Sequence, residues 1–304
     1  MNISVIICTY NNCKSLIDTL KSLEYQDSCS KSDFEVIVVN NNSQDSTNEV
    51  VEEFNRQGAL TISVVFEKRQ GIQYARNAGI TASKGEIIAF TDDDCLADSK
   101  YIHNLISIFQ GDANDFGFVG GRILPIWMVK EVPRWITDKN KGVLALLDYG
   151  NQRFYLDQNN IKEYKSLFYG ANFAFRKYVF DKYGKFDLTQ KYAQDTEMCT
   201  RLIKSGVRGL YCPELTIHHK IPENRLKKKY FYQWYQRRGK YSRTLNNWNK
   251  RYYHVFNLPW WLFKAYLKEW IYGNIESISD KEISHRCKEK YYKGMIEKQM
   301  HGIN

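Results

Sequence analysis

Short apolar, β-branched runs alternate with more polar stretches along the first third of the chain. An apolar run of this length is typical of a strand that is covered on both faces of a parallel sheet. Strands are predicted at residues 3–8, 34–39, 61–66 and 85–91, and helices at about 14–23, 46–58 and 71–82. Ser46 and Glu49 match a capping box at the start of the second helix. The alternation predicts an α/β fold with a Rossmann-like, mostly parallel sheet flanked by helices.

The pattern becomes less regular after residue 95. Helices are predicted at 101–109, 178–183 and 194–206, and strands at 116–123, 167–176 and 209–213. Residues 125–165 are irregular and aromatic, so we expect a mobile loop region over a site. There is no Gly-x-Gly-x-x-Gly after the first strand and no Gly-Lys-Ser/Thr, so dinucleotide-binding and P-loop folds lose their main support.

Three consecutive carboxylates, Asp92, Asp93 and Asp94, follow the fourth predicted strand. Adjacent carboxylates repel one another unless a cation or several donors lie among them. The carboxyl ends of strands are where open α/β sheets bind ligands. Carboxylate oxygens suit Mg²⁺ or Mn²⁺, and such ions are often bound together with a phosphate. The alternative is an acidic turn in which Asp93 or Asp94 caps the helix that begins near Ser99.

Two further groups of residues are candidates for chemistry. Asp195 lies at the start of an amphipathic helix, where a carboxylate acts either as the N-cap or as an ionised group that accepts a proton in a cleft. Capping and catalysis are compatible. His218 and His219 are candidate metal ligands, although adjacent histidines of this kind are more often structural or at the surface.

The composition limits the class of protein. A chain of 304 residues with 43% hydrophobic residues forms one large or two modest domains. The net charge of +10 predicts an acidic partner, such as a phosphate group, anionic lipid or nucleic acid. Seven scattered cysteines without a Cys-x-x-Cys favour a reducing compartment over disulfides or a zinc site. We expect neither a signal peptide nor a membrane-spanning helix.

Basic and aromatic residues dominate the chain after Pro222. Ten cations and no acidic residue occur between Arg225 and Arg251, namely Arg225, Lys227, Lys228, Lys229, Arg237, Arg238, Lys240, Arg243, Lys250 and Arg251. Residues 259–271 are apolar and aromatic but too often charged to span a bilayer. The pattern favours an anionic membrane surface, with Trp260, Trp261, Phe263, Tyr266 and Trp270 as an aromatic anchor. The alternative that remains open is a helical region whose aromatic residues pack on the core and whose basic face is solvated. Nucleic acid is not expected as a partner, because no nucleic-acid-binding motif occurs.

The strand-end motifs resemble, in order, those of family 2 glycosyltransferases of the GT-A fold, from about Ile3 to Arg225. Residues 4–11 resemble the strand that cradles the nucleotide. Residues 38–47 resemble the second motif, with Asn40 where the family usually has an Asp that accepts from uracil N3–H. An Asn still accepts through its amide oxygen. The resemblance implies nucleotide binding by Thr9, Tyr10, Asn11, Asn40, Asn42, Gly71, Arg76, Asp92 and Asp93.

The second half of the resemblance implies a metal and a general base. The three carboxylates occupy the position of the Asp-x-Asp motif, and the resemblance implies that Asp94 and His219 hold Mn²⁺ or Mg²⁺. Residues 194–197 are similar to the Glu-Asp motif, with Gln194 in place of Glu and with Asp195 as general base. The acceptor and donor-sugar side is implied to include Gly170, Ala171, Asn172, Gln194 and Glu197.

The resemblance implies an inverting glycosyltransferase that uses a nucleotide-diphosphate sugar, with UDP-sugar favoured. The acceptor is expected to be a hydroxyl of a glycan or lipid-linked molecule in surface polysaccharide or glycolipid synthesis. We expect a GT-A domain at 1–222, with a nucleotide half (1–95) and an acceptor half (96–222), and a helical basic region at 223–304. The protein is expected in the cytoplasm, peripherally on the cytoplasmic face of the membrane.

Two other functions remain open. A sugar nucleotidylyltransferase would need a Gly-rich, Arg-containing loop after the first strand, and residues 9–12 are not one. A non-catalytic sugar-nucleotide or lipid-binding protein could share the scaffold. The joint presence of Asp94, Asp195 and His219 argues against it.

Overall fold

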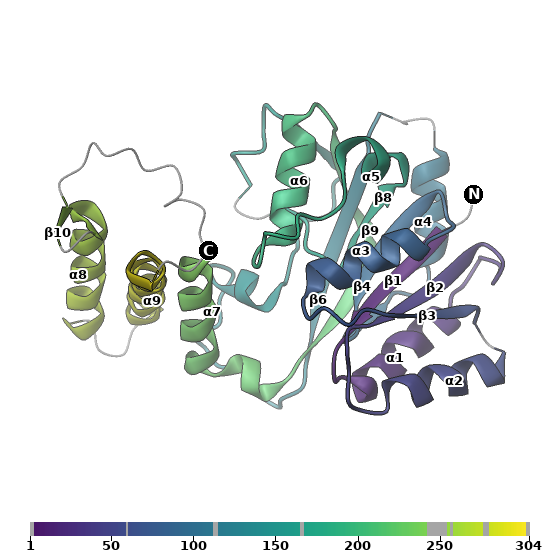
Figure 1. Ribbon diagram of the computed structural model, residues 1–304, viewed down its shortest axis with the longest axis horizontal. Helices are drawn as coiled ribbons and strands as arrows, with labels where there is room; N and C mark the ends of the chain where they lie inside the picture. Colours follow the sequence, from purple (N-terminus) through teal and green to yellow (C-terminus); the bar gives the residue numbers. More distant parts are fainter. Residues whose placement is uncertain are drawn as a thin grey trace. The chain divides into compact units, whose positions relative to one another are not determined.

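The computed structural model describes residues 3–58, 60–111, 115–164, 167–241, 254–255, 258–275 and 280–301. The chain forms two compact units (Figure 1). The first unit holds residues 1–126 and 145–220, and the second holds 127–144 and 221–304. Residues 127–144 thus group with the C-terminal helices, although the predicted boundary at residue 222 assigns them to the first domain. The predicted division into functional domains stays a prediction.

The first unit is built on a mixed sheet. Within the described residues, nine strands form this sheet, and eight of them follow the order β3-β2-β1-β4-β8-β6-β9-β5. The parallel part consists of β1 (Ile3–Thr9), β2 (Phe34–Asn40), β3 (Ile62–Phe66) and β4 (Ile87–Asp92). The helices between and after them are α1 (Cys13–Glu24), α2 (Thr47–Gln57), α3 (Ile72–Ala82) and α4 (Tyr101–Gln110). These elements match the strand and helix positions predicted from the hydrophobic pattern to within one or two residues.

The remaining strands are β5 (Cys95–Ala97), β6 (Phe118–Trp127), β7 (Phe154–Leu156), β8 (Phe173–Arg176) and β9 (Gly209–Ile221). They form the antiparallel pairs β4–β8, β6–β8, β5–β9 and β7–β9. The prediction of a strand over 167–176 was too long, and that over 209–213 was too short. In β9, buried Leu215, Ile217 and His219 alternate with half-exposed neighbours, so the strand continues well past Pro213. The helices of this part are α5 (Tyr178–Tyr183) and α6 (Gln194–Lys204).

Packing fixes the helices against the sheet. A Cβ at Gly79 of α3 would lie 2.5 Å from Cγ2 of Ile6 and 3.2 Å from Cγ2 of Val39, so only glycine lets α3 approach β1 and β2 this closely. Between the sheet and α5, the ring of Phe90 contacts those of Phe173 and Phe180. The core therefore carries the carboxyl ends of the parallel strands on a rigid base.

The structure tests two helix caps that the sequence offered. Ser46 is the N-cap of α2 but its side chain makes no capping hydrogen bond, so the capping box is not formed. The N-cap of α4 is Lys100, and neither Asp93 nor Asp94 caps that helix. The carboxylates after β4 are therefore free of this structural role.

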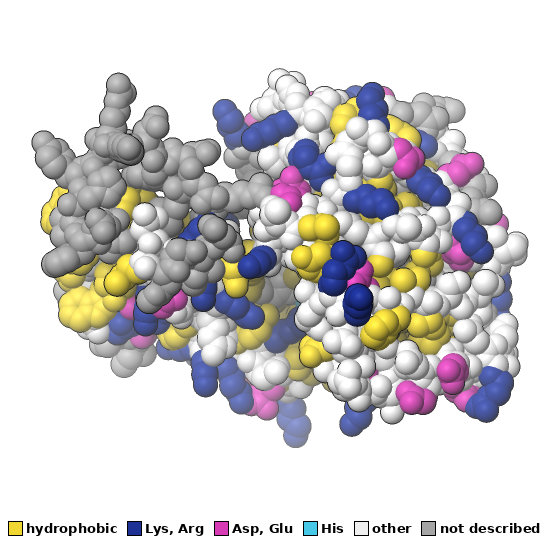
Figure 2. Space-filling view, in the orientation of Figure 1, with side chains coloured by type: hydrophobic (Ala, Val, Ile, Leu, Met, Phe, Trp, Pro, Cys, Tyr) yellow, Lys and Arg dark blue, Asp and Glu magenta, His cyan; other side chains and the backbone are white. Residues whose placement is uncertain are grey.

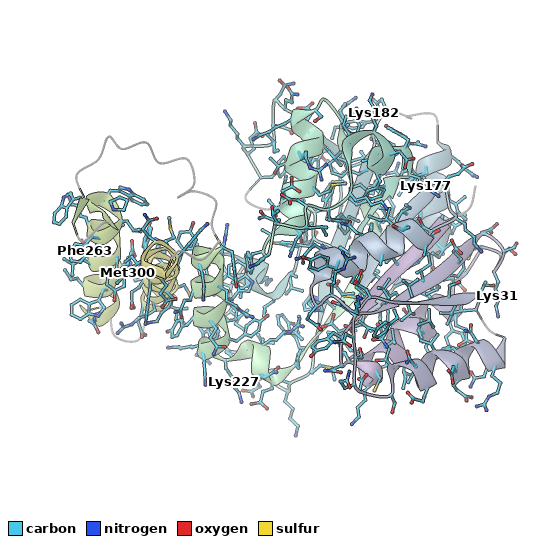
Figure 3. The ribbon with its side chains drawn as sticks, viewed as in Figure 1. Lys31, Lys177, Lys182, Lys227, Phe263 and Met300 are labelled. Atoms are coloured by element: carbon cyan, nitrogen blue, oxygen red, sulfur yellow. The ribbon has the colours of Figure 1, made fainter. Side chains whose placement is uncertain are left out.

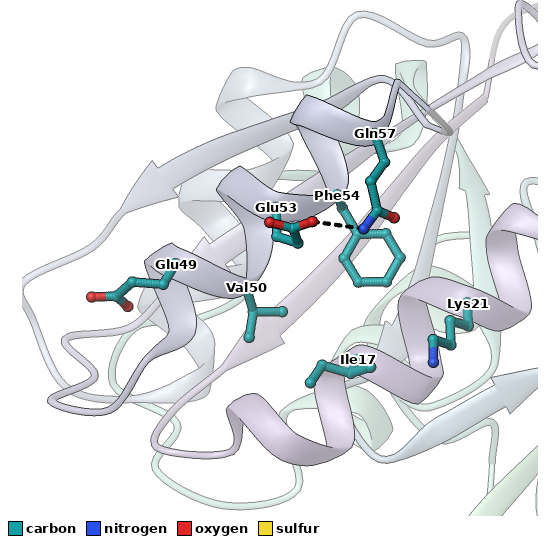
Figure 4. Close-up of a pocket in the computed structure, with 7 residues that line it drawn as sticks. All are labelled: Ile17, Lys21, Glu49, Val50, Glu53, Phe54 and Gln57. Carbon is teal, nitrogen blue, oxygen red and sulfur yellow. Dashed lines mark hydrogen bonds between the residues drawn. The ribbon is translucent and has the colours of Figure 1, made fainter.

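A shallow groove of about 330 Å³ lies between α1 and α2 (Figure 4). It is lined by Ile17, Lys21, Glu49, Val50, Glu53, Phe54 and Gln57. Gln57 donates to Glu53 across one turn of α2, at 2.7 Å. None of the predicted site residues lines this groove.

The second unit is mainly helical. It contains short 3₁₀ helices at Lys141–Leu144 and Glu223–Leu226, strands β10 (His254–Val255) and β11 (Leu258–Pro259), and helices α7 (Lys228–Lys240), α8 (Trp260–Ile275) and α9 (Asp280–His301). Helix α9 packs against both α7 and α8. A Cβ at Gly294 would lie 2.0 Å from the Gln236 oxygen, so the backbones of α9 and α7 touch at this crossing.

The second unit bears on the membrane expectations. No helix in the described part of the chain is long and apolar enough to cross a bilayer. Of the ten basic residues singled out above, Arg243, Lys250 and Arg251 lie outside the described residues. Residues 125–165 include the end of β6, a 3₁₀ helix and β7, and the other described residues of this segment are irregular, as expected.

Candidate active site

The ends of β1, β2 and β4 meet at one edge of the sheet. The parallel register pairs Thr9 with Asn40, and Cys8 with Asp92. Tyr10 follows directly and is 52% exposed. The strand-end residues that the sequence indicated are therefore neighbours in space, as expected for parallel strands.

Hydrogen bonds join the loops after β1 and β2. Asn11 has φ 50° and Asn42 has φ 66°, a left-handed conformation that Asn tolerates well. The Asn11 backbone N–H donates to Ser43 Oγ at 3.0 Å, and Asn11 Oδ1 accepts from the Gln44 N–H at 2.7 Å. The two loops thus form a single polar rim beside Tyr10.

Asn40 is nearly buried and its amide orientation is set by its neighbours. Its Oδ1 accepts from the Ser43 N–H at 2.8 Å, and its Nδ2 donates to Asn48 Oδ1 at 2.9 Å. Because a backbone N–H can only donate, Oδ1 must face Ser43. One lone pair on Oδ1 and one N–H on Nδ2 remain for another partner.

Asn41 is a site residue that sequence reasoning missed. Its Nδ2 donates to the carbonyl oxygens of Glu67 and Arg69, and its Oδ1 accepts from the Gly71 N–H at 2.9 Å. Its own N–H donates to the Thr9 oxygen. This side chain therefore ties the ends of β1, β2 and β3 to the start of α3. Three adjacent asparagines in the sequence gave no sign of which one points inward.

Arg76 and Gly170 pack directly against each other. The Arg76 side chain is nearly buried, with its guanidinium carbon 5.2 Å from the ring centre of Phe186. A Cβ at Gly170 would lie 1.7 Å from Arg76 Nη2, so any larger residue at position 170 would displace the Arg76 guanidinium. Arg76 also lies near the strand ends: burial raises the pKa of the Cys8 thiol to about 12, while the Arg76 charge lowers it.

Asp195 faces the same glycine. Its Oδ2 accepts from the Gly170 N–H at 3.2 Å, and its Oδ1 accepts from the Thr196 N–H at 2.8 Å. The N-cap of α6 is Ala193, which contradicts the alternative in which Asp195 is the N-cap. Asp195 lies in the first turn of α6.

The other predicted residues of this region differ in their surroundings. Gln194 is nearly buried, and Glu197 Oε1 accepts from Arg201 Nε at 2.9 Å. Glu197 Oε2 is buried without a hydrogen-bond partner among the described residues. Asn172 is fully buried. Its Nδ2 donates to the carbonyl oxygens of Arg122 and Leu215, and its Oδ1 accepts from the Tyr101 hydroxyl. Asn172 therefore supports the sheet from inside, and Ala171 beside it is also buried.

A buried pair of potential metal ligands lies where β5 meets β9. Register pairs Cys95 with His219, and His219 Nε2 is 3.3 Å from Asp94 Oδ1. His219 is 2% exposed, whereas the strand alternation turns His218 to the other face of β9. This geometry selects His219 from the two candidates left open by the sequence.

The donor set can be tested against the expected metals. The atoms of Asp94, Cys95 and His219 lie within 4.8 Å of one another. Mg²⁺ and Mn²⁺ prefer oxygen ligands to sulfur, so the buried Cys95 thiol is a poor ligand for either ion. A carboxylate and an imidazole remain, and they fit Mn²⁺ or Mg²⁺ that completes its shell with water and phosphate oxygens.

Asp93 belongs to the β1 end of the rim. Its Oδ1 accepts from Asn12 Nδ2 at 2.8 Å, and burial raises its pKa to about 7. Asn12 is a second residue that the sequence reasoning did not include. The three consecutive carboxylates thus have different surroundings: Asp93 accepts from Asn12, whereas Asp94 contacts His219.

Comparison with known proteins gives one family. Residues 4–184 match the sequence profile of glycosyl transferase family 2. A glucosyl-dolichyl phosphate glucuronosyltransferase of Haloferax volcanii is 25% identical over 235 residues, which are 74% of this chain and 71% of that protein. The poly(ribitol-phosphate) β-N-acetylglucosaminyltransferase TarS of Staphylococcus aureus is 30% identical over 152 residues, or 48% of this chain and 26% of TarS. The match to TarS thus spans about a quarter of that relative.

Solved structures agree on the fold. A mannosyltransferase of Pyrobaculum calidifontis, in complex with GDP-Man and Mn²⁺, has a TM-score of 0.65 at 20% identity. That match covers 99% of this chain and 88% of the other. Residues 1–349 of S. aureus TarS in complex with UDP have a TM-score of 0.56 at 16% identity, covering 99% and 92%. The architecture is therefore that of GT-A proteins.

Proposed function

Since this chain belongs to glycosyl transferase family 2 and is a glycosyltransferase, we propose that it transfers a sugar from a nucleoside-diphosphate donor to an acceptor hydroxyl with inversion at the anomeric carbon. The observation that carries this proposal is the buried Asp94–His219 pair at the end of β4, in the same unit as Asp195. Asp94 and His219 are suited to hold a metal ion that binds the diphosphate, and Asp195 is suited to accept a proton.

The donor's nucleotide is proposed to lie along the rim formed by the β1 and β2 loops. Exposed Tyr10 offers a face for stacking on a base, and Asn40 keeps one donor and one acceptor available. The nucleotide site also includes Thr9, Asn11, Asn42, Gly71, Arg76, Asp92 and Asp93. A UDP-sugar is the favoured donor, and a GDP-sugar is the rival, because solved relatives of this fold carry either nucleotide.

A divalent ion, Mn²⁺ or Mg²⁺, is proposed to be held by Asp94 and His219. When bound, it supplies positive charge that offsets the leaving diphosphate. Arg76 adds a fixed, nearly buried positive charge near the same strand ends. The bound ion and Arg76 would thus both stabilise the negative charge of the leaving diphosphate.

Asp195 is proposed as the general base. Its carboxylate takes the proton from the acceptor hydroxyl, whose oxygen forms the new bond to the anomeric carbon as the bond to the diphosphate breaks. The Gly170 and Thr196 N–H groups hold both carboxylate oxygens in position. Gln194 and Glu197, from the same helical turn, and Gly170 complete the sugar side, and the buried Ala171 and Asn172 support it from within. Attack from the opposite face needs no carboxylate nucleophile and inverts the configuration.

The acceptor is proposed to be a glycan or lipid-linked molecule at the cytoplasmic face of a membrane. The proposal is supported by the relative named for glucosyl-dolichyl phosphate and by the basic, aromatic C-terminal region. Residues 1–222 would hold donor and acceptor, and residues 223–304 would provide attachment to the membrane.

A panel of sugar nucleotides tests this function. Release of nucleoside diphosphate is measured for uridine, guanosine, cytidine and adenosine donors, each with and without Mn²⁺, and the product's anomeric configuration is read by NMR. We expect one base to be preferred, metal dependence, and inversion. Binding without turnover for every donor and acceptor would favour a non-catalytic binding protein, and release of inorganic pyrophosphate from a sugar phosphate and a nucleoside triphosphate would favour a nucleotidylyltransferase.

A further inference from the structure

Helix α8 exposes an apolar stripe on the side away from its own core. Trp260, Leu267, Trp270 and Ile271 are 49%, 41%, 46% and 40% exposed. Their spacing of three, four or seven residues places them on one face of a helix. Phe263, labelled in Figure 3, stacks on Trp260 with ring centres 5.8 Å apart. Hydrophobic side chains accordingly gather over α8 in Figure 2.

The opposite face of α8 is already packed. Leu262 is fully buried in a cluster with Met295, and Trp261 packs against that cluster. Two and three turns further, Glu269 is nearly buried with Oε2 2.5 Å from His285 Nδ1, and Gly273 lies beside the Arg286 side chain. One face of α8 is therefore packed within the unit, by apolar contacts and the Glu269–His285 pair, whereas the apolar face opposite is exposed in the described structure. An amphipathic helix of a globular protein normally turns its apolar face toward a partner.

The exposed stripe carries positive and no negative charge. Lys264 and Lys268 are exposed along its edge, whereas the helix's one carboxylate, Glu269, is turned inward. The stripe has aromatic residues near both ends, the aliphatic Leu267 and Ile271, and flanking lysines. This composition is typical of a helix that lies in the headgroup region of a bilayer. A protein groove would not require cations beside the apolar residues.

We propose that the α8 stripe, consisting of Trp260, Phe263, Lys264, Leu267, Lys268, Trp270 and Ile271, docks on the surface of a bilayer that contains anionic lipid. The stripe differs from the anchor that the sequence predicted, because Trp261 packs inward and Leu267 and Ile271 point outward. The inference deepens the proposed function, since a lipid-linked acceptor is presented at such a surface. It does not depend on which donor is used.

Flotation of the full chain with vesicles tests the stripe. The probes are phosphatidylcholine vesicles and vesicles that also contain phosphatidylglycerol. We expect binding to the mixed vesicles that weakens with salt. Leu267→Asp combined with Trp270→Asp should reduce binding at least about tenfold, because both side chains would insert below the headgroups. Lys264→Gln with Lys268→Gln should mainly remove the preference for anionic lipid.

Tyr178→Asp with Leu188→Asp is the matched control, because these residues of the first unit are 49% and 41% exposed. This variant adds the same charge and should bind vesicles as the wild type does. Circular dichroism checks folding, and calorimetry with UDP, GDP and Mn²⁺ checks the donor site separately. Wild-type protein that floats with neither vesicle, or a stripe variant that floats like wild type, overturns the proposal even when donor binding is intact. If light scattering instead finds that the stripe variant dissociates an oligomer, a second copy covers this face and the proposal is equally overturned.

Discussion

The strand-end rim and the α8 stripe are opposite exceptions to the usual distribution of residues. Around the rim, the polar side chains of Asn40 and Asn41 are buried, and hydrogen bonds to neighbouring backbone groups compensate for most of that burial. On α8, apolar side chains such as Trp270 are exposed. Buried polar groups hold a site in one shape, whereas exposed apolar groups gain free energy only when something covers them. The first arrangement suits catalysis and the second suits attachment.

The largest expected effect separates chemistry from binding within the rim region. Asp195→Asn should lower the transfer rate by about 10²- to 10⁴-fold, because the amide cannot accept the acceptor's proton. Affinity for the nucleoside diphosphate should stay near wild type. Single-turnover transfer together with calorimetry measures both quantities. A transfer rate close to that of the wild type would leave Asp195 as a structural residue of the α6 first turn.

The two adjacent histidines provide an internal control for the metal site. His219→Ala and Asp94→Ala should each remove the Mn²⁺ dependence of donor binding. Because these side chains would ligate the ion directly, metal affinity should fall by more than the roughly 10- to 100-fold that loss of an outer-shell partner costs. His218→Ala should change little, because this side chain lies on the other face of β9. Calorimetry with donor nucleotide, with and without Mn²⁺, measures the difference. Equal effects at the two histidines would contradict the assignment.

The two faces of α8 predict unequal effects on stability. Leu262→Ala should cost about 2–5 kcal/mol, because the removed side chain is fully buried. Leu267→Ala should change the free energy of unfolding by no more than about 0.5 kcal/mol, as an exposed position does. All seven tryptophans lie in the second unit, so urea unfolding followed by their fluorescence reports on this unit alone. A large cost at Leu267 would mean that the stripe is covered by this chain itself.

The smallest expected effect concerns the hub of the rim. Asn41→Ala leaves the Gly71 N–H and two carbonyl oxygens without their partner, at a cost of roughly 1–3 kcal/mol for a buried group left unsatisfied. Far-UV circular dichroism during urea unfolding measures it. Asn42→Gly is the control and should be nearly neutral, because φ 66° suits glycine. If both substitutions cost the same, the hydrogen bonds of Asn41 are not what holds the loops.

The sequence by itself determined the alternation of strands and helices and the place of the carboxylates after β4. Both follow from local rules, since apolar runs predict covered strands and parallel strands end at one edge. The helical pattern also singled out Asp195, and resemblance to a family added Arg76 and the role of Asp195 as general base. Their direct contacts with Gly170, which fill the space where its side chain would be, were not visible in the order of residues.

Only the tertiary structure decided which member of each repeated set performs each role. Asn41 rather than its neighbours points inward, and His219 rather than His218 meets Asp94. Asn172 became a core residue, and α8 acquired one covered and one exposed apolar face. In each case similar residues occur close together in the sequence, so residue type alone cannot tell which of them points inward. The choice depends on which backbone groups and side chains of distant segments lie opposite, and that is a property of packing alone.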